Sequence, residues 1–134
     1  MNLFVDTSVW SLALRRDETG GQPGVRRLRD ALDSGEGVFT TGLVLQELLQ
    51  GFQGPKARDA IVDRFASLPL LVPDRTDHTE AAESRNACRR NGIQVGTIDV
   101  LLAQLCVRHD LVMLSADRDF ALMAPHVGFT IWEP

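Results

Sequence analysis

Acidic residues stand at five positions of the chain where a carboxylate could carry chemistry. Asp6 closes the apolar segment "NLFV", and Asp117 follows the apolar segment "LVMLS" after one residue, with Asp119 two positions further on. Asp99 lies at the start of "IDVLLAQLCV", and Glu47 lies within "LVLQELLQG". Carboxylates without a nearby His or Cys suit a hard cation such as Mg²⁺ or Mn²⁺, which prefers oxygen ligands.

Bringing several of these carboxylates together would destabilise the chain unless a cation joined them. Two unit charges ~4 Å apart repel by roughly 4 kcal/mol at an effective dielectric near 20. Taken singly, each acid has an ordinary structural explanation. Asp6 could form a turn, and Asp99 could be a first-turn residue favoured by the helix dipole. Asp117 could cap a helix, and Glu47 could be solvated. The metal interpretation therefore depends on their meeting at one point.

Short apolar segments alternate with amphipathic ones along the whole chain. Strands are predicted at 2–6, 38–40, 68–73, 111–115 and 129–131. Alternating strands and helices are typical of an α/β fold with a parallel sheet covered on both faces. In such sheets the ligand crevice forms at the carboxyl ends of the strands, where Asp6 and Asp117 would lie.

The helices are predicted from apolar spacing and from their end signals. Ser8 is expected to cap a helix to about Arg16, and Asp77 with Glu80 to form a capping box for a helix to about Arg90. Thr97 is expected to cap a helix through 107 that is apolar nearly all round and therefore buried. Further helices are predicted at 23–34, 42–52, 55–66 and 118–124.

The composition is that of one folded domain over residues 1–134, with 44% apolar residues. No apolar stretch is long enough to cross a bilayer and no export signal is visible, so we expect a cytoplasmic protein. Cys88 and Cys106 lack CxxC spacing, which favours free thiols in a reducing compartment. His78, His109 and His126 lack the spacing of zinc ligands.

The net charge of 14 − 18 = −4 excludes a global attraction to nucleic acid, so RNA would need a local basic patch. An acidic pocket repels phosphate, and arginines are expected along its approaches. The same arginines could equally form ordinary solvated faces. The candidates are Arg15 and Arg16, then Arg26, Arg27 and Arg29, and finally Arg85, Arg89 and Arg90.

Four segments, "FVDTSVW", "LVLQELLQG", "IDVLLAQL" and "LSADRDF", occur in the order seen in the PIN-domain family. Across almost its whole length the chain resembles the VapC-type toxins of that family. The resemblance implies a three-layer α/β/α sandwich around a mainly parallel sheet of about five short strands. It also assigns catalytic and metal-binding roles to four acids and a variable role to Asp119. The four are Asp6, Glu47, Asp99 and Asp117.

The resemblance further implies what surrounds the site and what the protein does. Thr7, Ser8 and Ser115 match hydroxyl positions that support the metal ligands. The implied activity is Mg²⁺- or Mn²⁺-dependent cleavage of single-stranded or loop RNA by the toxin of a type II toxin–antitoxin pair. A homodimer, a VapB-like antitoxin that covers the site, and contact with DNA only through that antitoxin are also implied.

Three alternatives stay open on sequence alone. A receiver-type phosphoacceptor domain also places acids at strand ends. It would need a paired acid near the first strand and a late Lys, whereas Asp6 stands alone and Lys56 is the only Lys. A PIN fold used only as a binding module is the second alternative. The third keeps the nuclease but gives it a role in RNA processing or DNA cleavage.

Overall fold

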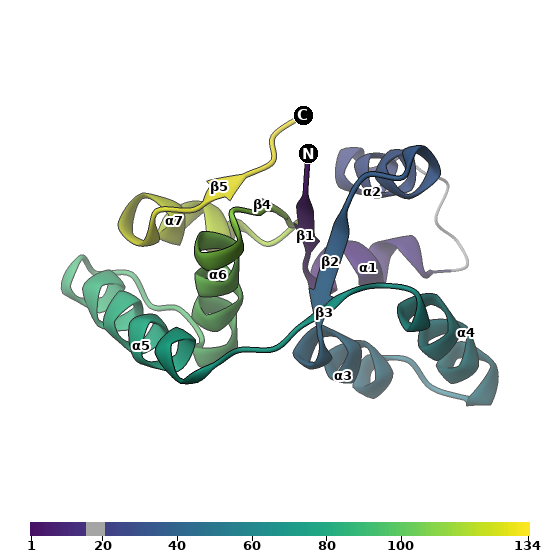
Figure 1. Cartoon of the computed structure of the whole chain (residues 1–134), viewed down its shortest axis with the longest axis horizontal. Helices are drawn as coiled ribbons and strands as arrows, with labels where there is room; N and C mark the ends of the chain where they lie inside the picture. The colour runs from purple at the N-terminus through teal and green to yellow at the C-terminus, as the bar shows by residue number, and fades with distance from the viewer. Residues whose placement is uncertain (16–20) are drawn as a thin grey trace.

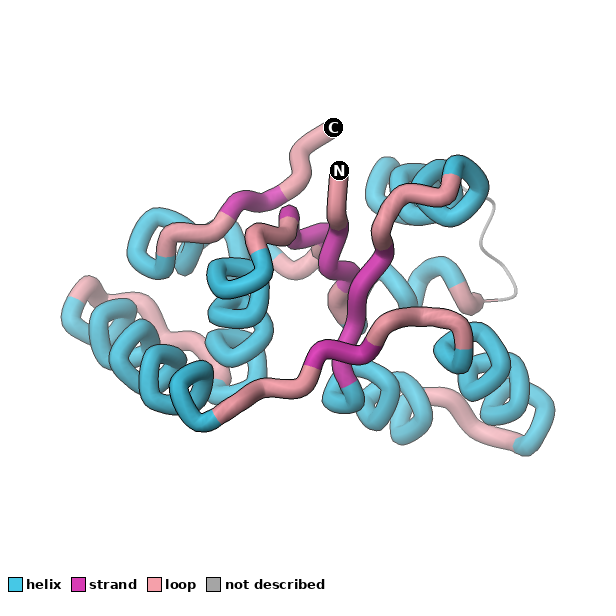
Figure 2. The backbone as a smooth tube through the Cα atoms, in the orientation of Figure 1, coloured by secondary structure: helices cyan, strands magenta, loops and turns pink. Residues whose placement is uncertain are grey.

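The computed structural model describes residues 1–15 and 21–134, and its strands form a single parallel sheet (Figures 1 and 2). The strand order is β3-β2-β1-β4-β5, with β1 at the centre. Val5 is in register with Leu114, so β1 and β4 end side by side at the carboxyl edge. The strands are β1 (Leu3–Val5), β2 (Val38–Thr41), β3 (Leu70–Leu71), β4 (Val112–Leu114) and β5 (Thr130–Ile131).

The helices form two groups, one on each side of the sheet, as Figure 1 shows. The first four pack with one another on the side of β2 and β3, and the last three pack together on the other side. The described part of the chain therefore forms the predicted three-layer α/β/α arrangement, with every strand pair parallel. The helices are α1 (Thr7–Ala13), α2 (Pro23–Ser34), α3 (Gly42–Gly51), α4 (Pro55–Ala66), α5 (Arg75–Arg90), α6 (Thr97–His109) and α7 (Arg118–Val127).

The central elements are buried on all sides, as their continuous apolar sequences predict. All three residues of β1 are 0% exposed, because helices cover both faces of the sheet. In α6, every residue from Val100 to Cys106 is buried, which confirms the prediction made from its apolar surface. Trp10 of α1 packs against Phe65 of α4 with ring centroids 5.0 Å apart, which joins two helices of one layer.

Three helices start at other residues than predicted. Asp6, not Ser8, caps α1, because its carboxylate accepts the Val9 N–H (3.2 Å) while its own backbone is extended. The capping box of α5 pairs Asp74 with Asp77, not Asp77 with Glu80. Both pairs have the same spacing, and the pair that directly follows Pro73 forms the box. Gly96, not Thr97, is the N-cap of α6.

Helix ends also differ from the predictions, most clearly in α1 and α7. Helix α1 ends at Ala13. Arg16, the predicted end, lies outside the described residues. Helix α7 continues past 124 through Pro125 to Val127 and is capped by Gly128, whose φ of 87° suits a residue without a side chain. A proline in the last turn removes one N–H without ending the helix, and this is why the predicted end came too early.

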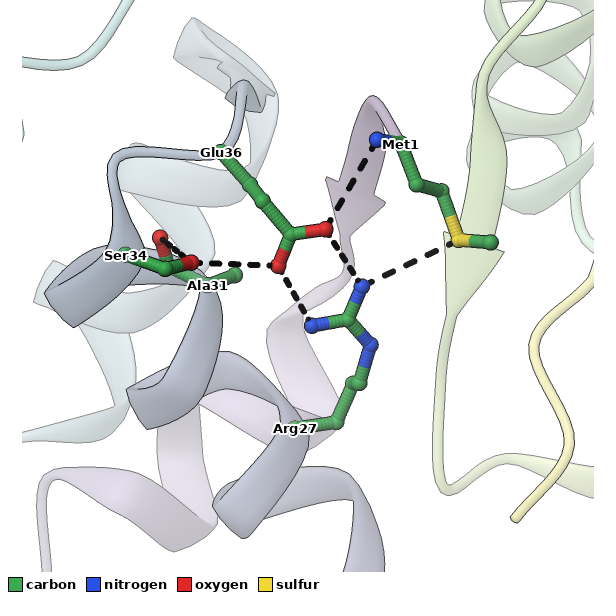
Figure 3. A network of polar contacts seen from close by, with 5 residues as sticks. All are labelled: Met1, Arg27, Ala31, Ser34 and Glu36. Carbon is green, nitrogen blue, oxygen red and sulfur yellow. Dashed lines mark hydrogen bonds and ion pairs between the residues drawn. The ribbon is translucent and has the colours of Figure 1, made fainter.

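A polar network ties the turn after α2 to the start of β1 (Figure 3). Arg27 donates two hydrogen bonds to the Glu36 carboxylate, at 2.7 and 2.8 Å, and the Met1 amino group lies 3.6 Å from the same carboxylate. The Arg27 hydrogen bonds are the main reason why the pKa of Glu36 falls to about 2. Arg27 thus has a carboxylate partner within the fold, which weakens its candidacy for RNA binding.

Two further predictions concern membrane-spanning segments and the state of the cysteines. No helix in the described residues is long and apolar enough to cross a membrane. Cys88 and Cys106 are both buried and unpaired, which confirms the free thiols expected from their spacing.

Candidate active site

The carboxyl edge of the sheet carries a buried carboxylate beside a serine hydroxyl. Asp6 follows β1 and Ser115 follows β4, and the two strands are neighbours in the sheet. The Asp6 N–H donates to the Leu114 carbonyl (3.2 Å), which holds the two strand ends together. The Ser115 hydroxyl donates to Asp6 Oδ2 at 2.6 Å. The strand ends thus place two predicted site residues in direct contact.

Asp6 is 4% exposed and its carboxylate is satisfied by short local hydrogen bonds. Besides Ser115, the Ser8 hydroxyl (2.7 Å) and the Val9 N–H (3.2 Å) both donate to Oδ1. Burial raises the pKa of Asp6, and these three donors offset part of that effect, while the charge of Asp117 adds to it. The local bonds fix the carboxylate in orientation without supplying a positive charge.

Glu47 lies close to Asp6, but it is carried by a helix and not by the end of a strand. It lies on α3, which directly follows β2, and it flanks the buried Val44 and Leu48 of that helix. The Thr7 hydroxyl donates to Glu47 Oε1 at 2.9 Å. The first turn of α1 therefore orients two acids, Glu47 through Thr7 and Asp6 through Ser8.

Asp99, Asp117 and Asp119 complete the acidic group. One carboxylate oxygen from each lies within 4.8 Å of the others. Asp117 caps α7 by accepting the Asp119 N–H (2.9 Å), and its own N–H donates to the Ser115 hydroxyl (2.9 Å). Burial, followed by the charges of Asp117, Glu47, Asp6 and Asp119, raises the pKa of Asp99 to about 6. The negative charge of each of the other four acids therefore acts on the Asp99 carboxylate.

A pocket of about 370 Å³ opens over these acids. None of its lining residues is Arg or Lys, so no basic side chain of that lining offsets the acidic charge. Such a set of oxygen donors fits a hard divalent ion, and no imidazole is among them. Burial raises the pKa of Cys106, with a further contribution from Asp6, so this thiol stays protonated. The pocket lining is Asp6, Thr7, Ser8, Ser11, Glu47, Asp99, Leu102 and Asp117.

Two lining residues were not predicted from the sequence. Ser11 lies four positions after Thr7 on α1, and this helical spacing puts both hydroxyls on one face. That spacing was the signal that could have found it. Leu102 lies three positions after Asp99 on α6 and covers the pocket floor from the buried side of that helix. Nothing in the sequence separates Leu102 from the other apolar residues of α6.

Three of the candidate RNA-binding arginines line hollows other than this pocket. Arg85 and Arg89 line a separate hollow beside α5, while Arg15 lines another with Phe52 and Lys56. Arg16 lies outside the described residues. The structure therefore brings together all the predicted acids and hydroxyls, whereas Arg15, Arg85 and Arg89 line other hollows.

Known proteins resemble this chain in both sequence and fold. Ribonuclease VapC11 of Mycobacterium tuberculosis is 29% identical over 124 residues, which cover 91% of each chain. The structure of VapBC2 from Rickettsia felis, bound to a DNA fragment from its promoter, superimposes with a TM-score of 0.75 at 18% identity. That match covers 99% of this chain and 98% of the other. VapC20 of Mycobacterium tuberculosis, a sarcin–ricin loop cleaving toxin, matches with a TM-score of 0.70 at 21% identity, over 99% of this chain and 100% of that one.

The strand order, the carboxylates at the carboxyl edge and these likenesses agree with the match to a family model. That model, described as the PIN domain, covers residues 3–124. The chain belongs to the PIN-domain family.

Proposed function

We propose that this PIN-domain chain is a metal-dependent endoribonuclease that acts as the toxin of a VapBC-type pair in the cytoplasm. The observation that carries the proposal is the meeting of four carboxylates from distant parts of the chain over one pocket, with Asp119 grouped beside two of them, Asp99 and Asp117. Burial, together with the charges of the other acids, raises the pKa of Asp99 to about 6. Such repulsion costs stability unless the site binds a cation.

The residues present fit a magnesium- or manganese-like ion. Asp99, Asp117 and Asp119 offer three oxygen ligands, and Asp6 and Glu47 face the same pocket. When bound, such an ion would lower the pKa of a water molecule and stabilise charge on the phosphoryl oxygens of RNA. Because Asp99 is deprotonated above its pKa of about 6, this carboxylate is available as a ligand at neutral pH.

The hydroxyl groups of the site hold the carboxylates in orientation. Ser8 and Ser115 each donate to a different oxygen of Asp6, and Thr7 donates to Glu47. Partners of this kind orient ligating carboxylates and tune their basicity. The pocket lining has no His or Lys that could act as general base, so proton transfer would fall to the carboxylates.

The similar proteins support the role in the cell. VapC11 and VapC20 are named as a ribonuclease and a toxin that cleaves the sarcin–ricin loop, and VapBC2 is a toxin–antitoxin complex bound to DNA. For this chain we infer an RNA substrate, a homodimeric state and a VapB-like antitoxin that covers the acidic pocket. Contact with DNA would come through that antitoxin.

The test is cleavage of single-stranded RNA in the presence of Mg²⁺ or Mn²⁺. We expect the wild-type protein to cleave and EDTA to abolish the activity. Asp6→Asn and Asp99→Asn should each lose it, whereas Asp59→Asn should not. Asp59 is the matched control because it lies exposed on α4, away from the pocket lining.

The outcomes separate the alternatives. Equal cleavage by all variants would exclude the acidic pocket as the active site. No cleavage by the folded wild-type protein with any RNA tested would favour a binding module. The toxin role is tested separately by expression in a bacterial host. Growth arrest that Asp99→Asn abolishes, and that a co-expressed small protein from the neighbouring gene relieves, would support the pair.

A further inference from the structure

A second hollow, of about 500 Å³, is lined by residues other than those of the acidic pocket. Arg85 and Arg89 line it from α5, and the loop of residues 93–96 closes its other side. The two arginines are four positions apart on the helix, so their side chains extend from the same face. Neither forms an ion pair with a carboxylate of the described residues, although the chain as a whole is acidic.

One of the two arginines in this hollow is held in place by a hydrogen bond to the backbone. Arg85 Nε donates to the Val95 carbonyl at 2.9 Å, which fixes this guanidinium against the loop. That bond uses the Nε donor and leaves the terminal N–H groups free of protein partners within the described residues. The Arg89 side chain makes no hydrogen bond there, so all its donors are available. Two guanidinium groups on one concave surface suit a phosphate, which they can bind through paired hydrogen bonds.

The hollow adjoins the acidic pocket at Gly96. Gly96 lines the hollow, and Asp99, three residues later in the first turn of α6, lines the acidic pocket. A Cβ atom placed on Gly96 would lie 3.7 Å from Asp99 Oδ2. The φ of Gly96 is −74°, a value that any residue adopts, so its backbone does not require glycine. Gly96 therefore lines the hollow, and its Cβ position is only one van der Waals contact distance from a carboxylate of the acidic pocket, that of Asp99.

We propose that this basic hollow binds a phosphate group of the RNA strand next to the one cleaved at the acidic pocket. The inference rests on the proposed ribonuclease function and adds a substrate-binding site to it. An RNA strand needs a cationic contact here because the acidic pocket repels its backbone. A phosphate held by Arg85 and Arg89 would fix how the strand crosses Gly96 toward Asp99, and so which bond meets the carboxylates.

The test compares Arg89→Gln with Arg90→Gln in the full chain. Arg90 is the matched control because it is the adjacent arginine on α5, is exposed and does not line the hollow. Arg89 is exposed and makes no side-chain hydrogen bond within the described residues, so we expect Arg89→Gln to fold like the wild type. The probe is a short fluorescein-labelled single-stranded RNA, with binding followed by fluorescence anisotropy in EDTA over a range of salt concentrations.

Arg89→Gln should weaken binding by about fivefold or more and reduce the slope of log affinity against log salt by about one, as loss of one phosphate contact predicts. Arg90→Gln should bind within about twofold of wild type, since it removes no contact in the hollow. In cleavage assays, Arg89→Gln should raise KM with kcat little changed, because the contact is made equally before and during the reaction. Arg85→Gln should do the same.

Two results would overturn the inference. One is a wild-type protein that does not bind the RNA at low salt, and the other is an Arg89→Gln variant that behaves like Arg90→Gln. Binding that depends on Arg89 without any metal-dependent cleavage would keep the basic hollow and remove the ribonuclease. Normal cleavage with an unchanged KM for Arg89→Gln would keep the ribonuclease and remove the basic hollow.

Discussion

Asp6 and Ser115, separated by 109 positions in the chain, lie in direct contact, with the serine hydroxyl 2.6 Å from the Asp6 carboxylate. The same hydroxyl accepts the Asp117 N–H at 2.9 Å. Ser115 therefore joins the acid that ends β1 to the acid that begins α7. The contact exists because β1 and β4 are neighbouring parallel strands that end in register.

Ser115→Ala should weaken metal binding and cleavage while leaving the protein folded. It removes the donor to Asp6 Oδ2 and the acceptor for the Asp117 N–H, so two ligands lose their orientation. Loss of a partner of this kind lowers metal affinity or activity by about 10- to 100-fold. Mn²⁺ titration and cleavage rates measure the effect. Ser34→Ala, at the exposed end of α2, is the control, and a Ser115→Ala protein as active as this control would refute the role.

Asp99→Asn should stabilise the metal-free protein above pH 6. The folded state holds a proton on Asp99 up to a pKa of about 6, against 3.8 as the ordinary value, so folding is favoured at low pH. That stability is present below pH 3.8 and is lost as the pH rises through about 6. The difference corresponds to at most ~3 kcal/mol, which solvent screening reduces to about 1–2 kcal/mol.

Urea unfolding in EDTA at pH 5 and at pH 8 measures this difference. The gain in unfolding free energy from Asp99→Asn should be larger at pH 8 than at pH 5, because only the higher pH ionises the wild-type carboxyl. Asp59→Asn should show no such pH dependence. A loss of stability in Asp99→Asn at pH 8 would mean that the acids do not repel one another in the folded protein.

Divalent ions should raise the melting temperature more at pH 8 than at pH 5. Protonation of Asp99 competes with metal binding, and a ligand that binds only the folded state stabilises it by mass action. At a free Mg²⁺ concentration of about 100 times Kd, the gain is about 2.7 kcal/mol. Differential scanning fluorimetry with and without EDTA measures it. A shift that is equal at both pH values would argue against metal binding to the raised-pKa carboxyl.

Asp77→Ala should destabilise the protein by about 3 kcal/mol, because it leaves the Arg108 guanidinium without its buried carboxylate partner. Asp77 is 0% exposed, and Arg108 of α6 lies 2.8 Å from it. Burial alone would raise the pKa of Asp77, but bonds from the Asp74 N–H, Gln104 and Arg108 lower it overall. The stability it confers is present above its ordinary pKa of 3.8 and is lost as the pH falls below that.

Chemical denaturation compares this variant with Asp59→Ala. Asp59 also pairs with an arginine, at 3.2 Å, but its side chain is 69% exposed. An exposed pair contributes about 0–1 kcal/mol. If the two variants lost the same stability, burial of Asp77 between α5 and α6 would not make its ion pair more stabilising than an exposed one.

The fold and the acidic site were largely predictable because strong local signals and one global rule determine them. The apolar segment that ends at Asp6 and the segment before Ser115 both read as buried strands. A parallel sheet brings such ends to one edge whatever their separation in sequence. The continuous apolar surface of α6 likewise predicted its burial. The resemblance to the PIN-domain family supplied the supporting hydroxyls, of which Thr7 now contacts Glu47.

What the sequence could not decide were choices between equivalent local patterns. Asp74 with Asp77 and Asp77 with Glu80 have the same capping spacing, and the structure uses the first pair, which directly follows Pro73. Asp77 takes part in two interactions. It forms the capping box with Asp74, and it pairs with Arg108, 31 positions away. The arginines showed the same ambiguity: Arg27 pairs with Glu36, whereas Arg89 faces a hollow, and both read alike in the sequence.

The most direct measurement of the central claim is Mn²⁺ binding to the purified protein by isothermal titration calorimetry at neutral pH. We expect saturable binding to the wild-type protein and to Asp59→Asn. Asp99→Asn should lose most of that affinity, because it removes a carboxylate that faces all the other acids. Absence of binding to the folded wild-type protein, or equal binding by Asp99→Asn, would contradict the account.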